Sequence, residues 1–284
     1  MVGEFHYRIP GRPLGTRPGA HASRAEGATG VYLGLRPLMA RADPRRIDLR
    51  RSATDPFGQW LVRSMTERVA VPVYVVADIS ASMAFGPGGG KQHSVADLVE
   101  STAQSAWRVG DPFGFVAADT RVEDSLTWPA TVSRAQGMRI AAALRSAVLA
   151  GHSAAGLLEA VHYLGRRRAL VLLASDFHFE LAFARSLLAS LARHFVVPVV
   201  VWDPAEVTGP GGGGWIEVAD SESSARRFLW LRAELGDRIE AAVAARRTAL
   251  TALFRGLGLR PLYLKTDFDP ERVTRYFFGE DDAG

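Results

Sequence analysis

The sequence predicts an α/β fold, a doubly wound and mostly parallel sheet with helices on both faces. Continuous apolar runs rich in β-branched residues, at 71–77, 168–175 and 195–202, are typical of strands buried on both faces. Segments with apolar residues at helical spacing separate these runs, and strands that alternate with helices indicate a parallel sheet. With 284 residues, of which 48% are hydrophobic and 23% charged, the chain is long enough to bury a full core.

The predicted elements follow one another along the chain from residue 71. The expected strands are 71–77, 112–118, 125–128, 168–175, 195–202, 215–218 and 260–265. The expected helices are 94–109, 133–149, 155–164, 180–194, 231–257 and 270–278. The long helix at 231–257 carries its apolar residues close to one stripe, and Pro270 lies near the first turn of the last helix.

Residues 1–70 differ in composition from the rest. They hold twelve arginines against six acidic residues, many Pro and Gly, and few apolar runs. We expect an arginine-rich N-terminal segment over 1–70, which packs as irregular structure with short strands on a main domain over 71–284.

The composition excludes several classes of function. The net charge is +4, but the chain has only two lysines, and its arginines do not interleave with aromatic residues as a base-stacking surface requires. We therefore expect no nucleic-acid partner. There is no cysteine, so disulfides and thiolate metal sites are impossible. No apolar run approaches the ~20 residues of a transmembrane helix, and the first ten residues do not form a signal peptide, so we expect a cytoplasmic protein without a transmembrane segment.

Oxygen-bearing side chains follow two of the buried strands. Asp78, Ser80 and Ser82 come directly after the strand at 71–77, and Asp176 follows the strand at 168–175. Ser153 supplies a hydroxyl before a helix. In open α/β sheets, ligands bind beyond the carboxyl ends of the strands. Mg²⁺ or another divalent cation prefers such oxygens, so we predict a metal site at these five residues.

This pattern resembles a known binding site. Asp-x-Ser-x-Ser followed by Met83, with a later Ser-Asp at a strand end, is similar to the metal-ion-dependent adhesion site of von Willebrand factor A domains. The upstream segment 43–48 (Asp-Pro-Arg-Arg-Ile-Asp) and the Arg-Ser-Ala at 51–53 resemble the bacterial family called domain of unknown function 58. Further matches are Trp-Asp-Pro-Ala-Glu at 202–206 and Thr-Asp at 266–267. Two positions depart from that family, because its Trp is Leu49 here and its usual Thr ligand is Ser153.

The resemblance implies a protein-binding module and not an enzyme. A metal held by two carboxylates and hydroxyls attracts an acidic residue of a client protein, without any catalytic step. Members of the family are typically encoded beside MoxR-type AAA+ ATPases, which implies such an ATPase as a partner. The short form is similar to the MxaS-like proteins of methanol-oxidation gene clusters, which implies a role in maturation of, or metal insertion into, a methanol dehydrogenase.

Other interpretations of the same residues are open to test. Asp78 is also placed to serve as the nucleophile of a Mg²⁺-dependent phosphohydrolase, although that chemistry usually has a second carboxylate where Ser80 stands. The glycine-rich stretch that ends in Lys91 lies where a phosphate loop would, but Phe85 and Gln92 break the nucleotide-binding pattern. We therefore expect a flexible loop beside the metal site. The segment 151–156 lacks the second glycine of a hydrolase nucleophile elbow.

Overall fold

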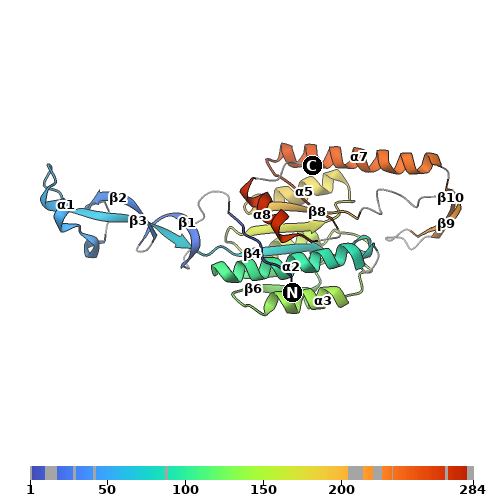
Figure 1. Ribbon diagram of the computed structural model, residues 1–284, viewed down its shortest axis with the longest axis horizontal. Helices are drawn as coiled ribbons and strands as arrows, with labels where there is room; N and C mark the ends of the chain where they lie inside the picture. The colour runs from blue at the N-terminus through green and yellow to red at the C-terminus, as the bar shows by residue number, and fades with distance from the viewer. Residues whose placement is uncertain are drawn as a thin grey trace. The chain divides into compact units, whose positions relative to one another are not determined.

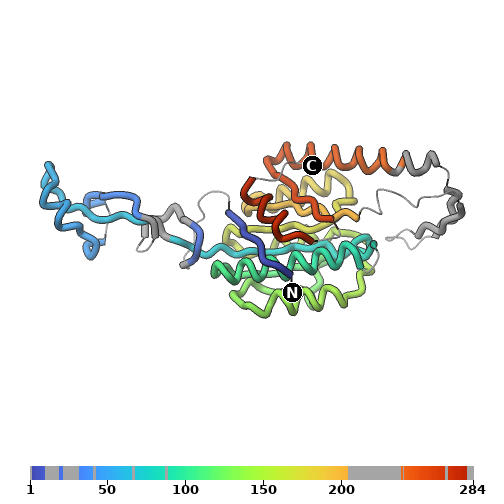
Figure 2. The backbone as a smooth tube through the Cα atoms, viewed as in Figure 1, coloured from blue at the N-terminus to red at the C-terminus, as the bar shows by residue number. Residues whose placement is uncertain are grey.

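The computed structural model describes residues 2–9, 18–27, 30–40, 43–86, 89–203, 214–219, 226–231, 233–265 and 268–279 (Figures 1 and 2). The chain forms two compact units, one made of Ile9–Val71 and the other of Met1–Arg8 with Pro72–Gly284. The first eight residues thus group with the larger unit. The domain ranges 1–70 and 71–284 stay a prediction.

The smaller unit is built on a three-stranded antiparallel sheet in the order β1-β3-β2. Its strands are β1 (Pro18–Gly27), β2 (Gly30–Pro37) and β3 (Leu61–Val69). The expectation of irregular structure was wrong here, because these strands have 10, 8 and 9 residues. Their weak apolar periodicity provided little indication of these strands in the sequence.

The Asp-Pro-Arg-Arg-Ile-Asp segment has a structural role in this unit. It contains the short helix η1 (Pro44–Arg46) and precedes the short helix α1 (Leu49–Ala53). The Asp43 carboxylate accepts a hydrogen bond from the Arg45 N–H, and the Asp48 carboxylate accepts one from the Arg51 N–H. Each aspartate therefore caps a helix start and satisfies an otherwise unpaired backbone donor.

The larger unit contains a six-stranded, mostly parallel sheet in the order β11-β8-β7-β4-β5-β6 (Figure 1). The strands are β4 (Val73–Asp78), β5 (Phe113–Ala118), β6 (Trp128–Thr131), β7 (Leu170–Ser175), β8 (Phe195–Val201) and β11 (Leu262–Leu264). Only β6 runs antiparallel to its neighbour. The chain builds β5 and β6 on one side of β4 and then crosses to β7 on the other side, so the strand order reverses at β4.

Helices cover both faces of this sheet. The longest helices are α2 (Gly90–Val109), α3 (Gln136–Ser146), α5 (Leu181–Ser190), α7 (Ala233–Gly256) and α8 (Pro270–Phe278). Alternate residues of β4 enter two separate cores: Val73 and Val75 pack with α2, α3 and α8, whereas Tyr74 and Val76 pack with α5 and α7. Burial on both faces explains why the strands read as continuous apolar runs.

The remaining elements lie between these. They are η2 (Ala81–Ala84), η4 (Asp124–Leu126), α4 (Leu157–Ala160), η5 (Val161–Leu164), and the antiparallel pair β9 (Gly214–Ala219) and β10 (Arg226–Leu231). The predicted strand at 125–128 was wrong in place, because η4 occupies its start and β6 begins at Trp128. The predicted helix 155–164 is α4 continued by the 3-10 turn of η5.

The start of the chain packs onto the larger unit. The Phe5 N–H donates to Ser105 Oγ of α2 at 3.0 Å, and the Phe5 ring stacks on Phe277 of α8. The Tyr7 hydroxyl donates to Asp111 Oδ2. Within the described residues, no helix is both long and apolar enough to cross a membrane.

Burial of His194 predicts acid sensitivity of the fold. His194 is buried and its Nδ1 accepts a hydrogen bond from the Ala169 N–H at 3.2 Å. Burial, with the charges of Arg193 and Arg168, lowers the pKa of His194 to about 4. The unfolded chain therefore binds the proton first as the pH falls below about 6.5, and stability drops between that pH and about 4.

We expect His194 to account for a loss of about 1–2 kcal/mol of unfolding free energy between about pH 7.5 and about pH 5. Urea unfolding at the two pH values measures it. In His194→Asn, whose side-chain oxygen replaces the Nδ1 acceptor, that part of the loss should disappear. An equal loss in the variant would contradict the assignment.

Candidate metal centre

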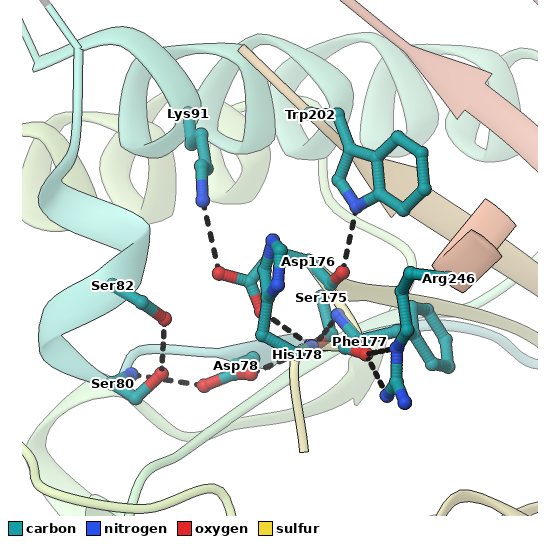
Figure 3. Close-up of polar contacts among 10 residues, drawn as sticks. All are labelled: Asp78, Ser80, Ser82, Lys91, Ser175, Asp176, Phe177, His178, Trp202 and Arg246. Atoms are coloured by element: carbon teal, nitrogen blue, oxygen red, sulfur yellow. Dashed lines mark hydrogen bonds and ion pairs between the residues drawn. The ribbon is translucent and has the colours of Figure 1, made fainter. Parts of the chain in front are cut away.

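The predicted site lies at the carboxyl ends of the adjacent parallel strands β4 and β7 (Figure 3). Asp78 is the last residue of β4, and Asp176 follows the last residue of β7. The strand order reverses at β4, and such reversal points are where open α/β sheets bind ligands.

Asp78 is a buried carboxyl group held at both oxygens. Only 2% of the surface of Asp78 is exposed to solvent. Oδ1 accepts a hydrogen bond from the Ser80 N–H at 2.9 Å, and Oδ2 accepts one from the Ser175 hydroxyl at 2.7 Å. Ser175 Oγ in turn accepts from the Phe177 N–H at 3.0 Å, which orients its proton toward Asp78. The carboxylate is thus fixed by one backbone N–H and one hydroxyl group.

Ser80 and Ser82 bring hydroxyl groups to the same place. Their Oγ atoms lie 3.2 Å apart, at the start of η2. Ser80 forms a parallel bridge with Gly151, and the Ala81 N–H donates to the Gly151 carbonyl at 2.8 Å. The second loop of the predicted site therefore lies against the Asp-x-Ser-x-Ser segment.

Asp176 is a second buried carboxyl group, also 2% exposed. Its Oδ2 accepts from the Lys91 ammonium at 2.9 Å, and its Oδ1 accepts from the His178 N–H at 3.1 Å. Its backbone carbonyl accepts from the Trp202 indole N–H at 2.8 Å. This strand end is fixed on all sides by contacts from other elements.

The residue after Asp176 has a strained backbone. Phe177 has a φ of 54°, a conformation that costs a residue with a Cβ about 1–2 kcal/mol. The Arg246 side chain on α7 holds it, because the guanidinium donates to the backbone carbonyls of Phe177 and Phe179. Non-glycine residues kept in this region cluster at functional sites.

The two carboxylates have opposite electrostatic surroundings. Burial and, secondarily, the negative charge of Asp176 raise the pKa of Asp78 to about 6, despite the hydrogen bonds from Ser80 and Ser175. Burial is the largest single influence on Asp176 and opposes its ionisation, but the nearby Lys91 charge together with smaller contributions outweighs it and lowers the pKa of that carboxyl. Weaker contributions come from the His178 charge and from a hydrogen bond with Ser82. A cation bound beside Asp78 and Asp176 would offset the effect of the Asp176 charge on Asp78.

The structure brings four of the five predicted ligands together. Asp78, Ser80, Ser82 and Asp176 are joined by direct contact or charge interaction. Ser153 differs, because its hydroxyl accepts from the Ala155 N–H at 3.1 Å within its own loop, and no hydrogen bond joins it to the other four described residues. Its role as a ligand stays a prediction.

The donor set fits a hard divalent cation. Two carboxylates and two hydroxyls, all oxygen, are the ligands that Mg²⁺ takes while keeping several waters. Across the described ranges, no group of three or more His, Asp or Glu side chains is placed to hold a metal.

Sequence reasoning missed two residues of the site. Lys91 was expected in a flexible loop, but it lies in the first turn of α2 and is fully buried. Ser175 belongs to the Ser-Asp of the resemblance but has no role assigned in the sequence-based prediction, and the structure shows that its hydroxyl orients Asp78. The available signal for Lys91 was its rarity, because arginine supplies nearly all other basic residues of the chain. The segment 204–206 and Thr266–Asp267 of the resemblance lie outside the described residues.

Gly156 fixes the second loop of the site by close approach. Its N–H donates to the Asp119 carbonyl at 2.8 Å, and a Cβ there would lie 2.4–2.7 Å from backbone atoms of Arg121. We expect Gly156→Ala to lower the unfolding free energy by about 1–3 kcal/mol, because backbone must shift to admit the methyl group. Chemical denaturation measures it.

Gly256 provides the matched control for this change. It lies at the end of α7, and a Cβ there would meet nothing within 4 Å. Gly256→Ala should leave stability unchanged or raise it by up to about 1 kcal/mol, since alanine favours helix. Equal effects of the two substitutions would show that the loop tolerates the methyl group.

Comparison with known proteins places the chain in a family. Residues 35–249 match the family described as protein of unknown function DUF58. An uncharacterized protein of Mycobacterium tuberculosis is 30% identical over 241 residues, which cover 80% of this chain and 72% of that protein. The chain belongs to the DUF58 family. The match includes Asp78, Ser80, Ser82, Ser153 and Asp176, so the whole candidate site lies within the DUF58 region.

Two solved structures are similar to this DUF58 chain at low identity. The conserved hypothetical protein BatB of Bacteroides thetaiotaomicron is 13% identical with a TM-score of 0.41, over 74% of this chain and 98% of that one. The vWF domain of the type V pili tip protein Mfa5 of Porphyromonas gingivalis is 19% identical with a TM-score of 0.31, over 40% and 43%. At these values the two structures imply nothing about what the DUF58 chain binds.

Proposed function

We propose that this DUF58 chain is a metal-dependent protein-binding module and not an enzyme. In this proposal the larger unit is a doubly wound, von Willebrand factor A-type domain. Its metal-ion-dependent adhesion site consists of Asp78, Ser80, Ser82 and Asp176, with Ser153 from the second loop. The observation that supports it most is the convergence of two buried carboxylates and two serine hydroxyls at the ends of β4 and β7.

The residues of the site would have different roles in binding. Asp78 and Asp176 would hold the cation and orient its waters, and the serine hydroxyls would supply neutral ligands. Ser175 and the Ser80 N–H keep the Asp78 oxygens in place. A bound Mg²⁺ or similar cation would supply a Lewis-acidic centre with room for one more oxygen. An acidic side chain of a client protein would bind there, and this binding would need no turnover.

The partner in this proposal is a MoxR-type AAA+ ATPase acting in the cytoplasm. The support is the resemblance of the segment 43–48 and the Asp-x-Ser-x-Ser loop to proteins encoded beside such ATPases. The narrower form is that the pair matures a methanol dehydrogenase or inserts its metal. Genes for an AAA+ ATPase and a dehydrogenase next to this one would favour the narrow form, and an ATPase gene alone would favour the general form.

Co-purification with the neighbouring AAA+ ATPase tests the proposal. We expect recovery of the ATPase with Mg²⁺, loss of recovery with a chelator, and loss in Asp78→Ala. Asp124→Ala removes an exposed carboxylate of η4 and is the matched control, which should behave as the wild type. Equal recovery from the wild type and Asp78→Ala would contradict a metal-bridged contact.

A phosphohydrolase that uses Asp78 is the alternative from another class. Its test is hydrolysis of a phosphate monoester by the purified chain in Mg²⁺. Our proposal predicts no turnover above that of Asp78→Ala. Strong Mg²⁺-dependent hydrolysis that disappears in Asp78→Ala would replace the binding function by a catalytic one.

A further inference from the structure

Lys91 is an unusual side chain for its position. Lysine is among the residues least often fully buried, and one that is buried needs a charge partner. The Lys91 side chain has no exposed surface, and its ammonium lies 2.9 Å from Asp176 Oδ2. The same ammonium lies 5.9 Å from the centre of the Phe85 ring. A positive charge is therefore built into the site where we place a metal.

The charge pattern explains why the lysine is there. Asp78 and Asp176 are both buried, and the negative charge of Asp176 disfavours ionisation of Asp78. Lys91 compensates part of this repulsion, because it pairs with Asp176 from the opposite side of the site (Figure 3). A divalent cation would compensate the same two charges. Lys91 and the metal would thus both interact with the carboxylate of Asp176.

We propose that the Lys91 ammonium is an internal competitor of the metal at Asp176. It holds Asp176 while the site contains no metal, and metal entry weakens the Lys91–Asp176 ion pair. With two carboxylates, one ammonium and one divalent cation, the formal charge of the loaded site is +1. That surplus favours a client carboxylate, so Lys91 weakens binding of the metal alone and strengthens selection of an acidic client. This inference rests on the function proposed above.

The affinity of the full chain for Mn²⁺ tests the competition. Lys91→Met keeps the length of an unbranched side chain and removes the charge. We expect this variant to bind Mn²⁺ at least about tenfold more tightly than the wild type in titration calorimetry, because a like charge next to the metal is gone. Lys265→Met removes the other, exposed lysine of the chain and should change the affinity less than about twofold.

A second measurement needs no variant. Because the chain has only two lysines, selective ¹⁵N-lysine labelling gives one ammonium signal from Lys91 and one from Lys265. Mg²⁺ should shift or broaden the Lys91 signal and leave the Lys265 signal in place. This readout decides the question if Lys91→Met does not fold.

The outcomes separate the two proposals. Tighter Mn²⁺ binding by Lys91→Met, or a Lys91 signal that responds to Mg²⁺, supports the competition. Equal metal binding by wild type and Lys91→Met, with an unchanged Lys91 signal, overturns the competition and leaves the metal-dependent function standing. No metal binding by either protein, with an unchanged Lys91 signal, overturns the metal-dependent function and the competition with it.

Discussion

Asp176→Ala is expected to lower the unfolding free energy by about 3–5 kcal/mol, because it leaves the buried Lys91 ammonium without its carboxylate. Transfer of an unpaired charge into the interior costs far more than loss of a surface pair. Urea unfolding followed by circular dichroism measures the change in this full chain.

A partly exposed ion pair provides the control. Arg145 pairs with Asp97, and their side chains are 30% and 32% exposed. Asp97→Ala should therefore cost no more than about 1 kcal/mol. The double variant Lys91→Met/Asp176→Ala should recover most of the loss, since neither charge remains buried. The account would be contradicted if Asp176→Ala lowered the unfolding free energy no more than Asp97→Ala does. It would also be contradicted if the double variant were as unstable as Asp176→Ala, because Lys91 and Asp176 would then not depend on each other.

Asp78→Ala is expected to weaken Mn²⁺ binding by more than about 100-fold. Loss of an outer residue that only orients a ligand typically costs 10–100-fold, and Asp78 is proposed to contact the metal itself. Titration calorimetry on the wild type and the variant measures the ratio. Circular dichroism must first show that the variant is folded, because the substitution leaves the Ser175 hydroxyl and the Ser80 N–H without an acceptor.

Ser175→Ala is the graded comparison for that loss. Ser175 contacts Asp78 through its hydroxyl and is not among the proposed ligands, so its removal should weaken metal binding by about 10–100-fold. An effect of Asp78→Ala no larger than that of Ser175→Ala would show that Asp78 acts only on the surroundings of the metal.

The central sheet was predictable because its strands are buried on both faces. The runs that became β4, β7 and β8 are short, rich in β-branched or aliphatic residues and apolar at nearly every position, which favours buried strands. The last helix was predicted with its observed ends, and Pro270 in its first turn was the signal for its start.

The failures have physical causes as well. The strand β10 was not predicted, because Arg226–Leu231 pairs with β9 and its local sequence shows no clear strand pattern. The ends of α3 and α5 were placed too far out, since alanine-rich sequence favours helix beyond the point where packing stops it.

The residues of the candidate site at the strand ends could be predicted from the sequence, whereas Lys91 on α2 could not. Asp78 and Asp176 follow recognisable strands, so sheet topology alone brings them together. Lys91 meets Asp176 across 85 positions of the chain, and its burial depends on a partner that only the folded chain supplies. The same dependence applies to Arg246, which holds the Phe177 carbonyl from α7.

An anomalous diffraction map of a crystal soaked in Mn²⁺ tests the central claim most directly. Our account predicts one strong peak among the side-chain oxygens of Asp78, Ser80, Ser82 and Asp176, with the Lys91 ammonium displaced from Asp176. The same map would show whether the Ser153 hydroxyl reaches the ion. No peak at these oxygens, in crystals whose site is open to solvent, would contradict a metal-dependent binding site.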